Sequence, residues 1–228
     1  MNNSRQPKSH IKLMAIILIL ITAVVGASVY FGVMLPKERA YKAAQNKITG
    51  ILLPTPKEIK SFKFTDNQGR SFTKKNLEGK WTMMFFGFTN CGLVCPTSLA
   101  SLNEMYKILQ AELQPNQLPQ VVFVSVDPER DTVKRLNDYV KAFNPHFTGA
   151  RGSDSETAAL TQQLHIAAAK MQVKGGKKDN YFINHSAEIL VINPNAQVVA
   201  YLTYPHKPES LVKDYKILLN AGVKHANP

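Results

Sequence analysis

Cysteine is scarce in this chain: only Cys91 and Cys95 occur among 228 residues, with three residues between them in "CGLVC". A disulfide that closes so short a loop removes little entropy from the unfolded chain, so a purely structural disulfide would add little stability. Two functional interpretations remain. The pair is either a redox couple or part of a metal site that takes a third ligand from elsewhere in the chain.

Charge is absent from Leu13 to Leu35, and as a helix these 23 residues would span about 34 Å, enough to cross a bilayer. The basic residues before this run also fit a signal peptide, but the run is too long for the core of one. No cysteine lies near Ala27, so a lipid-modified terminus is not indicated. We expect an uncleaved, single-pass anchor over residues 13–35 in the inner membrane of a bacterium.

The predicted anchor divides the chain into a cytoplasmic tail, residues 1–12, and a longer part that faces the periplasm. Basic residues on both sides of the anchor give little help with its orientation, but long domains cross the membrane regardless of such flanking charge. Residues 36–56 are expected to form a linker that ends at two prolines. The folded domain is expected over residues 57–228.

Nucleic-acid binding lacks sequence support, although the formal net charge is +12. The basic residues are scattered, and their densest group, "KGGKK" at 174–178, has no aromatic residues interleaved for stacking on bases. Such a charge suits a domain beside an anionic membrane or an acidic partner. The basic group at 174–178 is a candidate docking loop.

Hydrophobic periodicity and turn signals alternate strands with helices after the linker. The expected elements are a hairpin over 62–73, strands over 81–86 and 120–126, helices that begin at Pro96, Asp131 and Ser153, a hairpin over 187–203 and a helix from Pro208. The third helix, with a capping box of Ser153 and Glu156, is expected to run to about residue 168. This order predicts an α/β fold, a thioredoxin-like domain whose mixed sheet is flanked by helices.

Pro96 constrains the thiol loop. In a helix interior its ring would clash with the carbonyl of Gly92, so Pro96 is expected at the first helical position. Cys95 then immediately precedes the helix, whose amino terminus favours a thiolate on Cys95. The loop is expected to lie at the carboxyl edge of the sheet, where sites form.

A metal site needs a third ligand, and six histidines are available: His10, His146, His165, His185, His206 and His225. His185 is distinguished by its place in "YFINHSAEILVI", just before the terminal hairpin, because that loop faces the cysteine loop in a thioredoxin-like domain. Two thiolates and one imidazole suit three-coordinate copper(I), whereas a structural zinc site would want a fourth ligand. Residues alone leave redox exchange and metal binding both open.

Three segments together resemble the Sco/SenC family of membrane-anchored copper-binding proteins. They are "GKWTMMFFGFTNCGLVCPTSL", "VSVDPERDT" and "YFINHSAEILVINP", in the order and spacing of that family. The resemblance implies Cys91, Cys95 and His185 as copper ligands. It also implies delivery of copper to the dinuclear copper centre of cytochrome c oxidase.

The resemblance favours a non-enzymatic metallochaperone whose partners are the copper-bearing subunit of the oxidase and other copper chaperones or thiol reductants. Members of the family also resemble thiol-disulfide reductases, in which Cys91 and Cys95 would form a redox disulfide. A membrane-tethered oxidoreductase and a redox or copper sensor are therefore the alternatives. Loss of the site in a His185→Ala variant would distinguish copper binding from plain thiol exchange.

Departures from the family pattern lie beside the site. Gly92 and Leu93 stand where proline and aspartate are frequent, and Asn184 stands where aspartate is common. In "DPERD", Asp127 is expected to support the site and Asp131 to cap a helix. Phe88, at the end of an otherwise core-forming aromatic run, is a candidate shield for the thiols.

Overall fold

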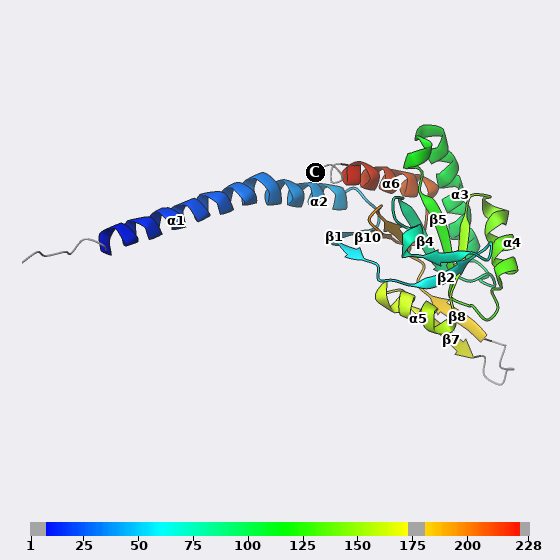
Figure 1. Cartoon of the computed structure of the whole chain (residues 1–228). Helices are drawn as coiled ribbons and strands as arrows, with labels where there is room; N and C mark the ends of the chain where they lie inside the picture. The colour runs from blue at the N-terminus through cyan, green and yellow to red at the C-terminus, as the bar shows by residue number, and fades with distance from the viewer. Residues whose placement is uncertain (1–7, 173–180, 224–228) are drawn as a thin grey trace, which may run out of the picture. The chain divides into compact units, whose positions relative to one another are not determined.

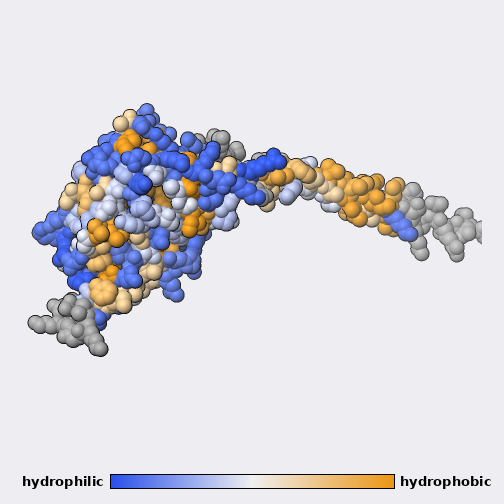
Figure 2. Space-filling view, turned by 180° about the vertical axis from the view of Figure 1, so that it is seen from behind, coloured by the Kyte–Doolittle hydropathy of each residue, from blue (hydrophilic) through white to orange (hydrophobic). Residues whose placement is uncertain are grey.

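The computed structural model describes residues 8–172 and 181–223, and the chain divides into two compact units, residues 1–46 and 47–228. The first unit is helical and comprises α1 (Lys8–Val29), a π-helical turn η1 (Tyr30–Met34) and α2 (Leu35–Gln45) (Figure 1). Its segment Ile11–Met34 is long and apolar enough to cross a membrane, and Figure 2 shows hydrophobic side chains along this helix. These properties fit a membrane anchor.

The second unit is built on an eight-stranded mixed sheet in the order β1-β10-β9-β4-β5-β6-β2-β3. The pairs β4–β5 and β5–β6 are parallel, and the other pairs are antiparallel. A separate two-stranded sheet pairs β7 with β8. The strands are β1 (Ile51–Glu58), β2 (Lys63–Asp66), β3 (Ser71–Thr73), β4 (Thr82–Gly87), β5 (Gln120–Ser125), β6 (Thr148–Arg151), β7 (Ala168–Gln172), β8 (Tyr181–His185), β9 (Ile189–Ile192) and β10 (Gln197–Leu202).

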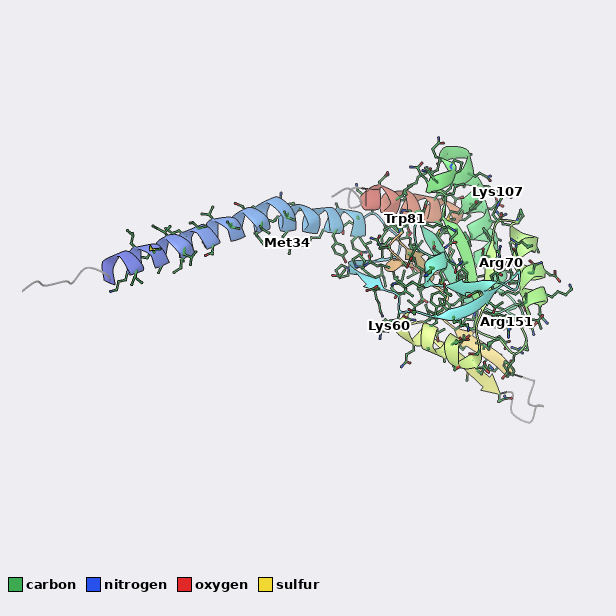
Figure 3. The ribbon with its side chains drawn as sticks, viewed as in Figure 1. Met34, Lys60, Arg70, Trp81, Lys107 and Arg151 are labelled. Atoms are coloured by element: carbon green, nitrogen blue, oxygen red, sulfur yellow. The ribbon has the colours of Figure 1, made fainter. Side chains whose placement is uncertain are left out.

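Helices cover both faces of this sheet. They are α3 (Val94–Glu112), α4 (Val133–Phe143), α5 (Asp154–Gln163) and α6 (Pro208–Val223), with 3₁₀ turns η2 (Lys74–Asn76) and η3 (Pro115–Gln117). Because successive strand side chains point to opposite faces, Met83 of β4 joins the core with α3, α4 and α6, whereas Met84 joins the core with α5 and β8. Trp81 lies just before β4 (Figure 3). It packs edge-to-face on Tyr215 of α6, with ring centroids 6.2 Å apart. The central strand is therefore buried on both faces, which explains its continuous apolar sequence.

Several locally encoded features are confirmed. The first hairpin turns near Gly69, whose φ of 81° lies in the left-handed region that favours glycine. Ser153 and Glu156 form the predicted capping box of α5, and α6 begins at Pro208. The third domain helix, α5, ends at Gln163, before the predicted end near residue 168, where β7 begins instead.

The segment expected to be a linker, residues 36–56, contains ordered structure. It includes most of α2 and the first part of β1, which pairs with β10 at the edge of the large sheet. Pro54 and Pro56 lie where the pairing register shifts, between Leu52 and Lys57, so their missing N–H groups cost no regular ladder bond. Edge position and irregular pairing reconcile two prolines with a strand. The basic group at 174–178 lies outside the described residues.

Candidate metal centre

The cysteine pair and His185 come together at one end of the large sheet. Ligand atoms of Cys91, Cys95 and His185 all lie within 4.8 Å of one another, and Cys95 Sγ is 3.4 Å from His185 Nε2. Cys91 lies in the loop after β4, Cys95 in the first turn of α3 and His185 at the end of β8. Cys95 is fully buried, whereas Cys91 and His185 are half-buried. Two sulfurs and one imidazole nitrogen form a donor set that suits copper(I).

The imidazole of His185 is oriented by its surroundings. Its Nδ1 lies 2.8 Å from the carbonyl oxygen of Ser186, and because a carbonyl can only accept, Nδ1 carries the proton. Nε2 therefore keeps its lone pair on the side of the cysteine sulfurs. The rings of Phe88 and Phe85 pack edge-to-face on the imidazole, with centroids 5.6 Å and 6.3 Å away. Phe88 contacts the histidine of the predicted ligand set directly.

The start of α3 differs from the prediction made from Pro96. The helix begins at Val94, so Cys95 and Pro96 are its second and third residues, and Cys95 does not precede the helix. Proline is tolerated here because the first N–H groups of a helix have no partner within it, and Gly92 lies outside the helix. The backbone N–H of Cys95 instead points at Cys91 Sγ, 3.4 Å away.

The thiolate was predicted on Cys95, and the electrostatics of the loop place it on Cys91. A hydrogen bond from the Cys95 thiol lowers the pKa of Cys91 to about 4; burial opposes this shift, and the backbone N–H groups of Cys95 and Leu93 add to it. The same hydrogen bond, followed by burial, raises the pKa of the Cys95 thiol. The sulfur at the helix amino terminus is that of Cys91, because Cys95 lies inside the first turn.

The two aspartates of "DPERD" are both fully buried and make different contacts. Asp127 accepts hydrogen bonds from Tyr181 and Arg130, so it contacts the strand that carries His185. Asp131 was predicted to cap α4, but Thr132 is the cap, and its side chain accepts from the N–H of Arg135.

Asp131 instead holds the start of the cysteine loop. Its carboxylate accepts hydrogen bonds from the hydroxyl groups of Thr89 and Ser125, both at 2.6 Å, and from the N–H of Thr89 at 3.2 Å. Burial raises the pKa of Asp131, and these hydrogen bonds oppose the shift. A buried carboxylate so placed fixes the backbone two residues before Cys91.

Residues where the chain departs from the family pattern are exposed. The side chain of Leu93 is 70% exposed, and Asn184 points to solvent on the face of β8 opposite His185. His206 is buried and hydrogen-bonded to Ser98 at 2.9 Å, outside the cluster. Of the remaining described histidines, His146 stacks on Tyr106 and His165 lies in a turn after α5.

Sequence reasoning missed Tyr181, Thr89 and Arg130, which contact the two aspartates. One signal was available for Tyr181. It lies four residues before His185, and alternate residues of a strand share a face. Thr89 gave no such signal, because its contact with Asp131 joins residues 42 positions apart.

Comparison with known proteins agrees with this architecture. The family model described as SCO1/SenC matches residues 53–220. The chain is 32% identical over 187 residues to the human mitochondrial SCO2 homolog, covering 80% of this chain and 68% of that protein. It is 33% identical over 150 residues to the mitochondrial SCO1 homolog 1 of Arabidopsis thaliana, covering 66% of this chain but only 43% of that longer protein.

A solved structure, Arabidopsis thaliana ScoI with copper bound, superposes with a TM-score of 0.64 at 30% identity, covering 72% of this chain and 98% of that chain. The predicted thioredoxin-like fold, with its mixed sheet flanked by helices, is confirmed. Since the family model spans most of the folded domain and more than half of the whole sequence, this chain belongs to the SCO1/SenC family.

Proposed function

We propose that this protein is a membrane-anchored copper chaperone that holds one copper ion through Cys91, Cys95 and His185. The observation that carries the proposal is the convergence of two sulfurs and one imidazole nitrogen, from segments 90 residues apart, within 4.8 Å. The copper-bound Arabidopsis relative supports copper as the ion. Neither cysteine is needed as a structural crosslink, because a disulfide in so short a loop adds little stability.

The three groups have different roles in taking up the ion. Cys91 supplies a thiolate that already exists near neutral pH, because its pKa is lowered to about 4. Cys95 must lose its proton when the ion binds, so uptake releases protons to the solvent. His185 offers Nε2 without losing a proton, because its proton lies on Nδ1.

Release requires incoming ligands to replace these three one at a time. Cys91 is half-buried and Cys95 is fully buried, so exchange begins at the more exposed ligands, Cys91 and His185. The proposed recipient is the copper-bearing subunit of cytochrome c oxidase, at its dinuclear centre. The proposed anchor over residues 13–35 holds the domain at the periplasmic face of a bacterial inner membrane, beside such a recipient.

A second candidate function is thiol-disulfide exchange with the cysteines of the recipient. The adjacent sulfurs favour it, with Cys91 as the nucleophilic thiolate and Cys95 as the thiol that resolves the mixed disulfide. In each cycle the substrate disulfide gains two electrons and Cys91 and Cys95 form a disulfide, which other thiol reductants would reduce again. This chemistry does not need His185 as a ligand.

The test is an anaerobic Cu(I) titration of the full chain in detergent, against a chromophoric chelator. Wild type is expected to bind one Cu(I), and Cys91→Ser, Cys95→Ser and His185→Ala are each expected to lose the tight site. His146→Ala is a matched control, because His146 is exposed and stacked on Tyr106. Tight binding that survives His185→Ala would overturn the copper proposal.

Two further assays separate delivery from exchange. Copper-loaded protein mixed with the purified apo copper-bearing domain of the oxidase is expected to produce the absorption spectrum of the dinuclear centre. Reduction of insulin disulfides measures thiol exchange, and His185→Ala is expected to retain it. An insulin reductase that never transfers copper would favour the second candidate.

A further inference from the structure

One loop contacts residues beside both halves of the Cys-Cys-His cluster, Tyr181 near His185 and Thr89 near the cysteines. It comprises residues 126–132, between β5 and α4, and carries both buried aspartates of "DPERD". We propose that Asp127 and Tyr181 are positioning residues that hold the His185 imidazole at the distance from the two sulfurs that Cu(I) coordination requires. This inference rests on the proposed copper-binding function and assigns it two residues that do not bind the ion.

The contacts on the histidine side are dense and buried. Tyr181 is 7% exposed, and its hydroxyl donates to Asp127 Oδ1 at 2.6 Å and lies 3.1 Å from Glu129 Oε2. Arg130 lies over the Tyr181 ring, with its guanidinium carbon 3.8 Å from the ring centroid, and donates to the Tyr181 carbonyl at 3.0 Å. Arg130 also donates to Asp127, so hydroxyl, ring, carbonyl and carboxylate form one connected group.

This group matters for His185 because of how its strand is paired. β8 pairs with β7 and is not part of the eight-stranded sheet. Sheet hydrogen bonds therefore do not fix β8 relative to the cysteine loop, which follows β4 of the large sheet. Tyr181 and His185 lie on the same face of β8, and the Tyr181 contact with Asp127 connects that face to the end of β5.

The cysteine side is fixed from the same loop. Asp131 accepts from the hydroxyl and the N–H of Thr89, and Arg135 donates to the Thr89 hydroxyl at 2.6 Å and to the Asn90 side chain. This one short segment is thus hydrogen-bonded both to the strand that carries His185 and to the start of the cysteine loop. Its two aspartates lie four residues apart and are joined by the hydrogen bond from the N–H of Asp131 to the carbonyl of Asp127.

The experiment is a double-mutant cycle that joins Tyr181→Phe with His185→Ala, measured by Cu(I) competition on the full chain in detergent. Tyr181→Phe removes the hydroxyl and leaves the ring beneath Arg130. We expect it to weaken Cu(I) binding about tenfold or more, the usual effect of losing a group that orients a ligand. In the His185→Ala background the same change is expected to have no further effect on Cu(I) affinity, because the group it orients is gone.

Tyr215→Phe is the matched control. Its hydroxyl is hydrogen-bonded to the Gln117 carbonyl at 2.6 Å, and the residue is fully buried in α6. It is expected to lower thermal stability without changing Cu(I) affinity. Tyr181→Phe is also expected to leave the reduction potential of the Cys91–Cys95 pair unchanged. A general loosening of the site would change that potential.

Wild-type Cu(I) affinity in Tyr181→Phe would overturn the inference while leaving the proposed function intact. An equal loss of affinity in the wild-type and His185→Ala backgrounds would also overturn it, since the hydroxyl would then act elsewhere. Asp127→Asn provides a second variant and is expected to reproduce the effect of Tyr181→Phe. A wild-type protein that binds no Cu(I), or binds it equally well without His185, would instead remove the proposed function.

Discussion

Replacing Gly87 by alanine is expected to disturb the copper site by displacing the sulfur of Cys95. Gly87 ends β4, and a Cβ atom built there would lie 2.6 Å from Cys95 Sγ and 2.8 Å from Cε2 of Phe123. Both neighbours are fully buried, so neither can turn toward solvent. Ordinary contacts between such atoms are about 3.5–4.0 Å, so sulfur and ring must each retreat by about 1 Å.

The magnitude follows from the overlap. Extra atoms forced into a packed core usually cost about 1–3 kcal/mol, and each kcal/mol lowers the Tm of a domain of about 150–250 residues by about 2–4 °C. We therefore expect Gly87→Ala to lower the Tm of the metal-free protein by about 2–12 °C. A displacement of about 1 Å also exceeds the tolerance of about 0.2 Å in metal–ligand distances, so Cu(I) affinity should fall about tenfold or more.

Gly92→Ala is the control from the same loop, because no atom lies within 4 Å of its Cβ position. Circular dichroism melts would give the Tm of each variant, and Cu(I) competition would give the affinities. Equal Tm and affinity in the two variants would refute the steric argument. A lower Tm with unchanged affinity for Gly87→Ala would show that the Phe123 ring yields and the sulfur does not.

Two further predictions concern protonation and the buried aspartate. The lowered pKa of Cys91, about 4, keeps its thiolate formed at higher pH. Its alkylation by iodoacetamide should therefore be nearly constant from about pH 6 to about pH 8, whereas an ordinary thiol would react about tenfold faster per pH unit. Cys95→Ala, which removes the hydrogen bond that lowers this pKa most, should restore a rise with pH, and a steep rise in wild type would contradict the assignment. Asp131→Ala should lower the free energy of unfolding in urea by about 1–3 kcal/mol, because the Thr89 donors lose their buried acceptor. Asp138→Ala, which breaks an exposed pair with Lys134, should change it by less than about 1 kcal/mol, and similar losses would contradict the proposed role of Asp131.

Features encoded over a few residues could be predicted from the sequence. The capping box of Ser153 and Glu156, the hairpin at Gly69 and the helix from Pro208 all depend on neighbours in the chain. The charge-free run after residue 12 likewise identifies a helix long enough for a bilayer. Short-range geometry and hydrogen bonding decide these elements, so their residue types suffice.

β1 could not be predicted in the same way. Its two prolines argue against a strand, and only the partner β10, about 140 residues later, makes an edge strand of the segment. Pro96 led to a wrong prediction of where α3 begins. Its ring excludes a helix interior, but the first turn offers several acceptable positions, and local sterics alone do not choose among them.

The sequence by itself determined the cysteine pair, the family and the candidate third ligand His185. Tertiary structure decided that the two sulfurs and the imidazole lie within 4.8 Å, and that Cys91 is the sulfur with the lowered pKa. The physical reason is that these properties depend on contacts between distant parts of the chain. A pKa depends on which donors surround an atom, and those donors come from segments that only folding brings together. Asp131 follows the same rule, since its contacts and burial make it a support for the cysteine loop.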